Sequence, residues 1–487
     1  MIDTPSVDWF ALAPELALLA ASAVALLAAV LVPRRVRRTV AAIVCALGYA
    51  GAVVAGVLLY LHSEDAETVV AGGFSRDRLV ASAAVLVGGI GIATVLLAAR
   101  DRMRDDHVAE YYALLAAAGA GMIFFVGASN LMTLFLALEW FSICLYILCA
   151  IDGDQPGGLE AALKYLVMGS FGSAILLFGS ALVYGVTGKL RFVEIAAAGH
   201  GHDPVLAVGL ALIIVGLGFK ASAAPFHMWT PDVYQGAPTS VTAFMSSATK
   251  VAALLLSLRV LREAFPSQAH LWTVAAAGLA VVSLAVGNLA ALAQRDVKRL
   301  LAYSSISHAG FMFIALAANN ASGARALLFY LLPYSAMSLG AFAVVAARER
   351  ELGVPVTLDN LAGLGWERPF LGASLWLFLL GFAGFPLTGG FWGKIYVFSA
   401  AVERGWTWLV IVGVVATAVS LAYYLAVVRS LYMRPALEGR LAVAGGSPPS
   451  EPLLETAVAA CVVVTVGTFF FVGPLADIAR DATAFLF

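Results

Sequence analysis

Residues 216–238 of the chain read GLGFKASAAPFHMWTPDVYQGAP. They close a run of apolar residues that is long enough to cross a membrane as a helix. The stretch nevertheless contains a cation, a helix breaker and a titratable ring, in Lys220, Pro225 and His227. Proline removes a backbone donor and clashes with the preceding turn, so we expect the helix to kink or stop near Pro225. A break inside a membrane persists only where protein or water satisfies the freed backbone groups. We therefore expect the freed carbonyls to bind the ammonium of Lys220.

The composition of the whole chain is that of a membrane protein. Of its 487 residues, 62% are hydrophobic and 12% are charged, and the mean hydropathy is +0.93. Charges are too few to cover a water-soluble protein of this length, and apolar segments of about 20 residues recur from end to end. We therefore predict an all-α polytopic membrane protein with about fourteen transmembrane helices, in which residues 1–487 form a single membrane domain. The net charge of −1 gives no indication of a nucleic-acid partner.

A second apolar segment repeats the interrupted pattern. Residues 381–394 read GFAGFPLTGGFWGK and again combine a proline, Pro386, with a lysine, Lys394. The two segments would be the seventh and twelfth spans, which cross the membrane in opposite directions. Paired interruptions of this kind are typical of inverted-topology repeats. We predict two inverted five-helix repeats, helices 4–8 and 9–13, with helices 7 and 12 interrupted. The corresponding divisions are three N-terminal helices in 1–108, a first repeat in 109–262, a second repeat in 270–432 and a C-terminal helix in 453–487.

The distribution of positive charge predicts the orientation. If the link PRRVRR at 33–38 is cytoplasmic, the links on that side carry sixteen Lys and Arg residues and the opposite links carry nine. This asymmetry follows the positive-inside rule. We therefore expect both termini to lie outside.

Ionisable side chains stand deep within four of the predicted spans, namely Glu139, Lys220, Lys250 and Lys394. A charge at the middle of a bilayer costs about 2.5–3.5 kcal/mol on insertion scales, so it rarely persists without a partner or a task. Lys164 stands near one end of its span, where a structural ion pair or a snorkelling side chain is an alternative to a role in proton transfer.

Two histidines could extend this set. The alternative for His227 is a helix-end residue bonded to backbone, and the alternative for His308, in AYSSISHAGF at 302–311, is a satisfied polar contact among serines. Burial favours the neutral form of a lysine and a nearby carboxylate favours the charged form, so a movable carboxylate can switch a lysine between holding and releasing a proton. We therefore predict a lateral proton path through the deep lysines, water and these histidines, with Glu139 and Lys220 coupled in one half-channel.

The predicted orientation gives this path a direction. Lys220 would lie towards the cytoplasm, Lys250 near the middle and Lys394 near the outer end. A proton that visits them in this order moves outward, so Lys394 is the predicted release residue. The alternative for Lys394 is an anchor whose long side chain snorkels to the outer headgroups.

The chain resembles subunit N of bacterial proton-pumping NADH–quinone oxidoreductase, the respiratory complex I, in four stretches. They are APELALL at 13–19, FHMWTPDVYQGAPTSVTAFMSSATK at 226–250, DVKRLLAYSSISHAGF at 296–311 and GFPLTGGFWGKIYVF at 384–398. The resemblance implies an antiporter-like subunit that couples electron transfer from NADH to quinone, in partner subunits, to proton pumping. The family's proton-carrying positions fall on Glu139, Lys220, Lys250 and Lys394, and its further positions fall on Lys164 and His227.

The resemblance also implies the setting. The partners would be neighbouring antiporter-like and small membrane subunits, a peripheral redox arm and the lipid of a bacterial plasma membrane. FMN, iron–sulfur clusters and quinone would be bound by partner subunits, with no cofactor and no metal in this chain. The sequence agrees, because it has no dinucleotide fingerprint after a strand and no cluster-ligand spacing of cysteines. Its four cysteines, Cys45, Cys144, Cys149 and Cys461, stand singly in apolar runs.

Two other functions fit a chain with this pattern. One is a subunit of a multisubunit cation/proton antiporter, which shares the fold, and the other is an inert scaffold that packs against pumping subunits. Lysine sites without a cage of carboxylates and carbonyls favour protons over sodium as the transported ion. Co-purification with flavin and iron–sulfur subunits would separate the first function from the antiporter.

Overall fold

The computed structural model describes residues 7–63, 66–101, 106–199, 203–434 and 451–487. Residues 1–6 and three of the sixteen charges that were assigned to the predicted cytoplasmic side, Arg102, Arg104 and Arg440, lie outside the described residues. The described chain is almost entirely helical, which confirms the predicted all-α class, and twelve of its helices are long and apolar enough to cross a membrane. The count of about fourteen spans and the limits of the two repeats stay predictions.

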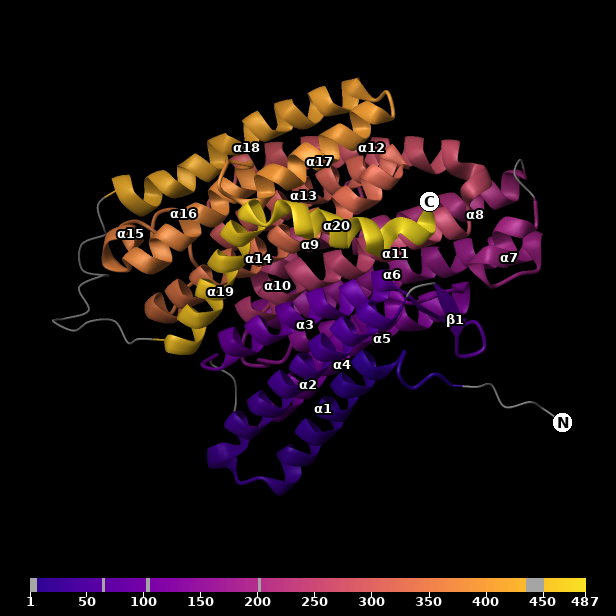
Figure 1. Ribbon diagram of the computed structural model, residues 1–487. Coiled ribbons are helices and arrows are strands. Elements are labelled where there is room, and N and C mark those ends of the chain that lie inside the picture. Colours follow the sequence, from indigo (N-terminus) through magenta and orange to yellow (C-terminus); the bar gives the residue numbers. More distant parts are fainter. Residues whose placement is uncertain (1–6, 64–65, 102–105, 200–202, 435–450) are drawn as a thin grey trace.

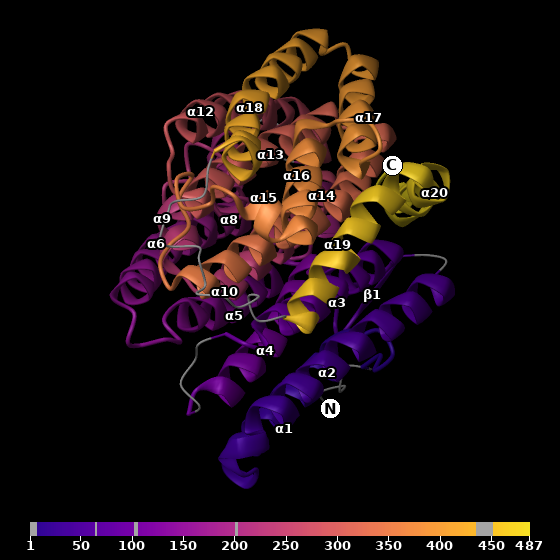
Figure 2. The same cartoon turned by 90° about the vertical axis from the view of Figure 1, so that its left-hand side faces the viewer.

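The N-terminal third of the chain consists of long helices. They are α1 (Ala13–Leu31), α2 (Arg34–His62), α3 (Arg78–Ala98), α4 (Val108–Val126), α5 (Leu131–Cys149) and α6 (Pro156–Thr187). Between α2 and α3, strands β1 (Glu67–Val69) and β2 (Phe74–Arg76) pair as a short antiparallel hairpin. In both views α1 and α2 lie at one end of the molecule (Figures 1 and 2).

The middle of the chain supplies the core. Its elements are α7 (Phe192–Ala197), α8 (Pro204–Lys220), α9 (Trp229–Gly236), α10 (Thr239–Phe244), the π-helical turn η1 (Met245–Thr249), α11 (Lys250–Glu263), η2 (Pro266–Gln268), α12 (Ala269–Leu292), α13 (Val297–Ala318) and α14 (Ala321–Leu352). The most apolar stretch of 239–263 is wholly buried, and those of α13 and α14 are 94% and 89% buried, against 39% for α1 and α2. Among the twelve candidate spans of the described residues, the two that carry Lys250 and His308 are therefore the most enclosed.

The C-terminal part covers the other end. It contains α15 (Leu364–Glu367), α16 (Pro369–Ala383), α17 (Gly389–Glu403), α18 (Thr407–Met433), α19 (Pro452–Phe470), α20 (Val472–Thr483) and η3 (Ala484–Leu486). Helix α18 lies at the end opposite α1 and α2 (Figures 1 and 2). The segment 453–487, expected as one helix, is divided between α19 and α20. Pro474 stands in the first turn of α20, where proline is tolerated, and α20 contacts α3 and α14 instead of continuing α19.

Both expected interruptions are present. Helix α8 ends at Lys220 and α9 begins at Trp229, with Pro225 between them. Helix α16 ends at Ala383 and α17 begins at Gly389, with Pro386 between them. Each broken segment thus consists of two shorter helices, as predicted for helices 7 and 12.

One buried ion-pair cluster joins the N-terminal helices to the core. Arg259 near the end of α11 is fully enclosed, and its guanidinium donates to Asp77 at 2.6 Å, to Glu263 at 2.9 Å and to the carbonyl of Val126 at 2.9 Å. Asp77 also caps α3 by accepting from the backbone of Val80. Arg259 is one of the nine charges that the sequence analysis counted in the links opposite to PRRVRR, whereas the structure encloses it with three acceptors around its guanidinium.

Candidate functional site

The first break is closed by side chains from two helices. The carbonyl of Phe219 accepts from the indole nitrogen of Trp229 at 3.1 Å, and the carbonyl of Ala221 accepts from Nζ of Lys250 at 3.0 Å. The freed backbone groups are therefore satisfied by protein, as a break within a membrane requires. We expected Lys220 to use these carbonyls, but Lys250 of the neighbouring helix α11 does so.

Lys220 is buried and turns towards α5 and α6. Its ammonium donates to Oγ of Ser142 at 2.8 Å and to the hydroxyl of Tyr165 at 3.2 Å, and it lies 4.4 Å from the ring centre of Phe141. Glu139 stands three residues before Ser142, on the same face of α5. It is partly exposed and its Oε1 has no hydrogen-bond partner among the described residues. The two charges share a neighbourhood but do not form an ion pair.

Lys250 stands where a π-helical turn returns to α-helix. The turn η1 ends at Thr249 and α11 begins at Lys250, whose side chain is completely buried. A π-turn inserts an extra residue into the helix, and such bulges occur frequently at functional sites. Here the bulge lies in the helix segment that carries Lys250 across to the first break.

The second break holds Lys394. Its Nζ donates to the carbonyl of Ala383, the last residue of α16, and to Oγ1 of Thr417, both at 3.3 Å. The ammonium also lies 4.4 Å from the ring centre of Phe311. Lys394 is only 4% exposed, so its side chain is directed into the protein and not towards headgroups.

His308 lies between tyrosines in the buried part of α13. Its Nδ1 is 2.8 Å from the hydroxyl of Tyr330 and its Nε2 is 3.2 Å from the hydroxyl of Tyr424. Tyr424 in turn lies 2.5 Å from Oγ of Ser304. We considered a contact among serines for this histidine, and the structure supplies tyrosine hydroxyls on both ring nitrogens.

Hydroxyl groups from α13, α14 and η1 lie between this histidine and the helix of Lys250. The hydroxyl of Tyr334 lies 3.1 Å from Oγ of Ser305 and 3.2 Å from the carbonyl of Ser246. Ser338 donates to Oγ of Ser246 at 2.8 Å, and Ser246 stands one helical turn before Lys250. We call Ser246, Ser304, Ser305, Tyr334 and Ser338 the hydroxyl cluster.

Lys164 and His227 lie apart from this interior. Lys164 pairs with Glu160 and with Asp232 at 2.8 Å each, its side chain is 44% exposed, and Asp232 also binds Arg299 at 2.5 Å. His227 is partly exposed, and its Nδ1 has no hydrogen-bond partner among the described residues. The structure therefore brings Lys220, Lys250, Lys394 and His308 into one interior and leaves the other two at its edge.

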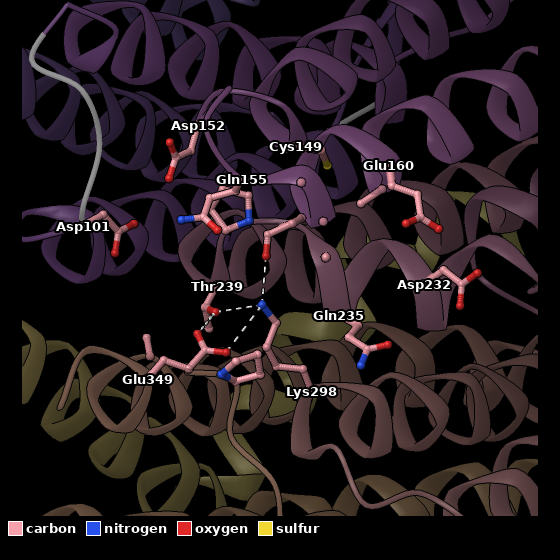
Figure 3. A pocket seen from close by; sticks show the side chains of 18 of the residues that line it. Asp101, Cys149, Asp152, Gln155, Glu160, Asp232, Gln235, Thr239, Lys298 and Glu349 are labelled. Atoms are coloured by element: carbon pink, nitrogen blue, oxygen red, sulfur yellow. Dashed lines mark hydrogen bonds and ion pairs between the residues drawn. The ribbon is translucent and has the colours of Figure 1, made fainter. Parts of the chain in front are cut away.

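A cavity of about 550 Å³ opens beside that interior (Figure 3). Its lining includes Asp101, Cys149, Asp152, Gln155, Glu160, Lys164, Asp232, Gln235, Thr239, Lys298 and Glu349. Lys298 donates to the carbonyl of Ala237 and to Oγ1 of Thr239 at 2.9 Å each, and lies 3.8 Å from Oε1 of Glu349. Thr239 donates to Glu349.

Sequence reasoning missed the cavity residues and the tyrosines. Lys298 was counted only as a link charge, and Tyr330, Tyr334 and Tyr424 are ordinary members of apolar helices. Pro225 and Pro386 mark where the helices break, but no pattern marks which hydroxyls face the breaks. Among the described residues, no group of three or more His, Cys, Asp or Glu side chains could hold a metal ion.

Known proteins resemble this chain over most of its length. Residues 128–420 match the family described as NADH:quinone oxidoreductase/Mrp antiporter, TM. NADH-quinone oxidoreductase subunit N of Salinibacter ruber is 43% identical over 420 residues, which cover 83% of this chain and 82% of that protein. A chain of respiratory complex I from Thermus thermophilus is 35% identical, with a TM-score of 0.80 and coverage of 96% and 99%. A chain of the Mrp complex from Dietzia is 22% identical, with a TM-score of 0.85 and coverage of 98% and 97%, a similarity of fold alone.

Proposed function

This chain belongs to the family of NADH-quinone oxidoreductase subunit N, and from that membership we propose how it moves protons. It is an antiporter-like membrane subunit of an NADH–quinone oxidoreductase, whose partners are the other membrane subunits and the peripheral arm. We place the subunit in a bacterial plasma membrane with both termini outside. FMN, iron–sulfur clusters and quinone belong to the partner subunits, where the redox chemistry takes place.

One observation carries the proposal. Lys220, Lys250 and Lys394 are all buried, and each ammonium contacts only hydroxyls, carbonyls or an aromatic ring among the described residues. An isolated buried charge is costly unless it is paired, so an ammonium in such a place is poised between keeping and releasing its proton. Small changes in the surroundings then suffice to move the proton on.

The remaining groups supply the connections. Lys220 ends α8, and the next residue, Ala221, provides the carbonyl that Lys250 binds. The hydroxyl cluster leads from the helix of Lys250 to His308, and both His308 and Lys394 contact Phe311. In the proposed order a proton passes from Lys220 to Lys250, then through the hydroxyl cluster and His308 to Lys394. Glu139 acts on Lys220 from α5, and Lys394 releases the proton to the exterior.

Replacing Lys394 by arginine tests this order. Arginine keeps the positive charge and can reach the same acceptors, but it does not give up its proton in proteins. In membrane vesicles that contain the assembled complex, Lys394→Arg should abolish proton pumping by NADH oxidation. Electron transfer to an artificial acceptor, which needs only the peripheral arm, should remain. The matched control is Lys189→Arg at an exposed lysine, which should pump normally. Normal pumping by Lys394→Arg would refute the release assignment.

A subunit of a multisubunit cation/proton antiporter is the second candidate, because its fold is the same. The two functions differ in their partners. Mild solubilisation and purification through a tag on this chain should recover flavin and iron–sulfur proteins. Recovery of antiporter subunits without any redox protein would favour the second candidate.

A further inference from the structure

We propose that Lys298, Thr239 and Glu349 form a gate through which protons pass from the cavity to the hydroxyl cluster. The inference rests on the proposed function, because it describes a further supply of protons to the same interior. It concerns residues outside the set of deep charges that the sequence indicated.

The cavity lies where it can take up protons from the side predicted to be cytoplasmic. Its lining comes from the segments that follow α3, α5, α9 and α14 and from the start of α13. Successive spans cross in opposite directions, so these alternate links lie on one side of the membrane, the side that the charge distribution predicts to be cytoplasmic. A volume of about 550 Å³ holds several water molecules, since each occupies about 30 Å³ in the liquid. Figure 3 shows the carboxylates of Asp152, Glu160 and Asp232 around the cavity.

Lys298, Thr239 and Glu349 lie together at the wall of this cavity and are joined by hydrogen bonds and an ion pair (Figure 3). The side chain of Lys298 is only 6% exposed, and the hydroxyl of Thr239 accepts from Lys298 while it donates to Glu349. A hydroxyl with one donor and one acceptor neighbour can pass a proton between them. Lys298 gives a proton to Oγ1 of Thr239 as the Thr239 proton moves to the Glu349 carboxylate. The result is a neutral amine and a neutral acid, so the charges vanish together and the pair no longer holds itself closed.

An apolar layer separates the gate from the hydroxyl cluster. On α13, Lys298 and Ser305 are seven positions apart, which is about 10 Å of helix. Leu301, Ala341 and Phe342 line a small gap next to Ser304, Ser305, Tyr334 and Ser338, and this gap has no room for water in the structure. A hydrophobic constriction of this kind conducts only when it becomes wet. Loss of charge at Lys298 and Glu349 frees both side chains to admit that water.

The route beyond the layer reaches both neighbouring sites. Ser338 binds Ser246, one turn from Lys250, and Ser304 lies against Tyr424, which contacts His308. A proton delivered here can therefore recharge Lys250 or His308 without passing Lys220. Water in the cavity then returns a proton to the Lys298 amine, and Glu349 gives its own to water in the layer. The net result is transfer of one proton inward from the cavity.

Substitution of Lys298 tests the gate in the assembled complex. Lys298→Arg keeps the charge and the hydrogen bond to Ala237 but releases no proton, whereas Lys298→Met removes all three functions. Both variants should lose proton pumping, with electron transfer to an artificial acceptor retained. The matched control is Arg295→Met, at an exposed cation that precedes α13, which should pump normally. If Lys298→Arg pumps like the unsubstituted complex, Lys298 only caps a helix end and the gate is wrong.

Parallel measurement of Lys394→Arg separates this failure from failure of the proposed function. If Lys298→Arg pumps normally and Lys394→Arg does not pump, only the gate proposal is refuted. If both variants pump normally, the gate proposal and the proposed function are both refuted. If Lys298 variants do not assemble, thiol labelling decides the question. A Leu301→Cys chain that also carries Cys149→Ser should react with a small cationic thiol reagent from the cavity side during turnover, but not at rest. Equal labelling in the two states, or none during turnover, overturns the gate.

Discussion

Gly384 offers a way to displace Lys394 without changing its chemistry. Gly384 follows the last residue of α16 with a φ of +83°, and a Cβ there would lie 2.9 Å from Cδ of Lys394. Ordinary carbon contacts are about 3.5–4.0 Å, so Gly384→Ala must move the lysine chain by about 0.6 Å or more. The hydrogen bond from Lys394 to Ala383 is already 3.3 Å long, so we expect it to break if the ammonium moves away from the carbonyl by the same amount.

A second glycine, Gly405, separates the backbone penalty of Gly384→Ala from the loss of the Lys394 hydrogen bond. Gly405 has the same φ of +83°, and nothing lies within 4 Å of a Cβ built on it. Left-handed backbone costs an L-residue about 1–2 kcal/mol, so both alanine variants carry this penalty. Only Gly384→Ala also loses a hydrogen bond to a charged group, which contributes about 1.5–3 kcal/mol. The two variants should therefore differ by that second amount, as a lower thermal dissociation midpoint of the complex carrying Gly384→Ala.

Proton pumping is the decisive assay. Vesicles with Gly405→Ala should pump normally, and vesicles with Gly384→Ala should pump poorly although both complexes reduce an artificial acceptor. Because the lysine chain is flexible, the clash is relieved by moving Lys394 and not by unfolding the helix. Equal pumping by two fully assembled variants would refute the claim that Lys394 must hold its position.

Three further changes test other parts of the structure. Glu139→Gln should lower proton pumping, because the carboxylate on α5 no longer acts on Lys220. Unchanged turnover at all pH values would show that Glu139 and Lys220 are not coupled. Asp77→Ala leaves the enclosed guanidinium of Arg259 short of a partner, which costs about 3–5 kcal/mol, and should lower the thermal dissociation midpoint far more than Asp77→Glu. Val36→Cys should react with an impermeant thiol reagent only in inside-out vesicles, and labelling from the outer face of intact cells would reverse the orientation.

The sequence predicts the interruptions because their cause is local. Pro225 and Pro386 cannot continue a helix, whatever surrounds them, and the helices do end close to them. The burial of Lys220, Lys250 and Lys394 could also be predicted, because a cation within an apolar span has few other places to go. These features depend on neighbours in sequence and on the thickness of a membrane.

The partners of these groups depend on tertiary packing and could not be predicted. The carbonyl freed at Ala221 accepts from Lys250 of α11, whereas the adjacent Lys220 donates to Ser142 and Tyr165. Tyr330 meets His308 from the next helix, α14, and Tyr424 meets it from α18, which is 116 residues away in sequence. The cavity is lined by segments spread between residues 101 and 355, so no local sequence pattern predicts it.

If protons take the proposed path, the hydroxyl cluster determines how successive protons follow one another. Each hydroxyl has a single hydrogen, so when a proton passes along a hydroxyl pair such as Ser338 and Ser246, or Tyr334 and Ser305, the O–H bonds are left pointing backward. The hydroxyl cluster cannot pass a second proton until each O–H bond has rotated back. A tyrosine hydroxyl prefers to lie in the plane of its ring, so Tyr334 must swing through half a revolution between its two orientations. On the proposed path, protons are therefore delivered one at a time, with a delay set by reorientation, and back-flow is blocked until the O–H bonds have turned back.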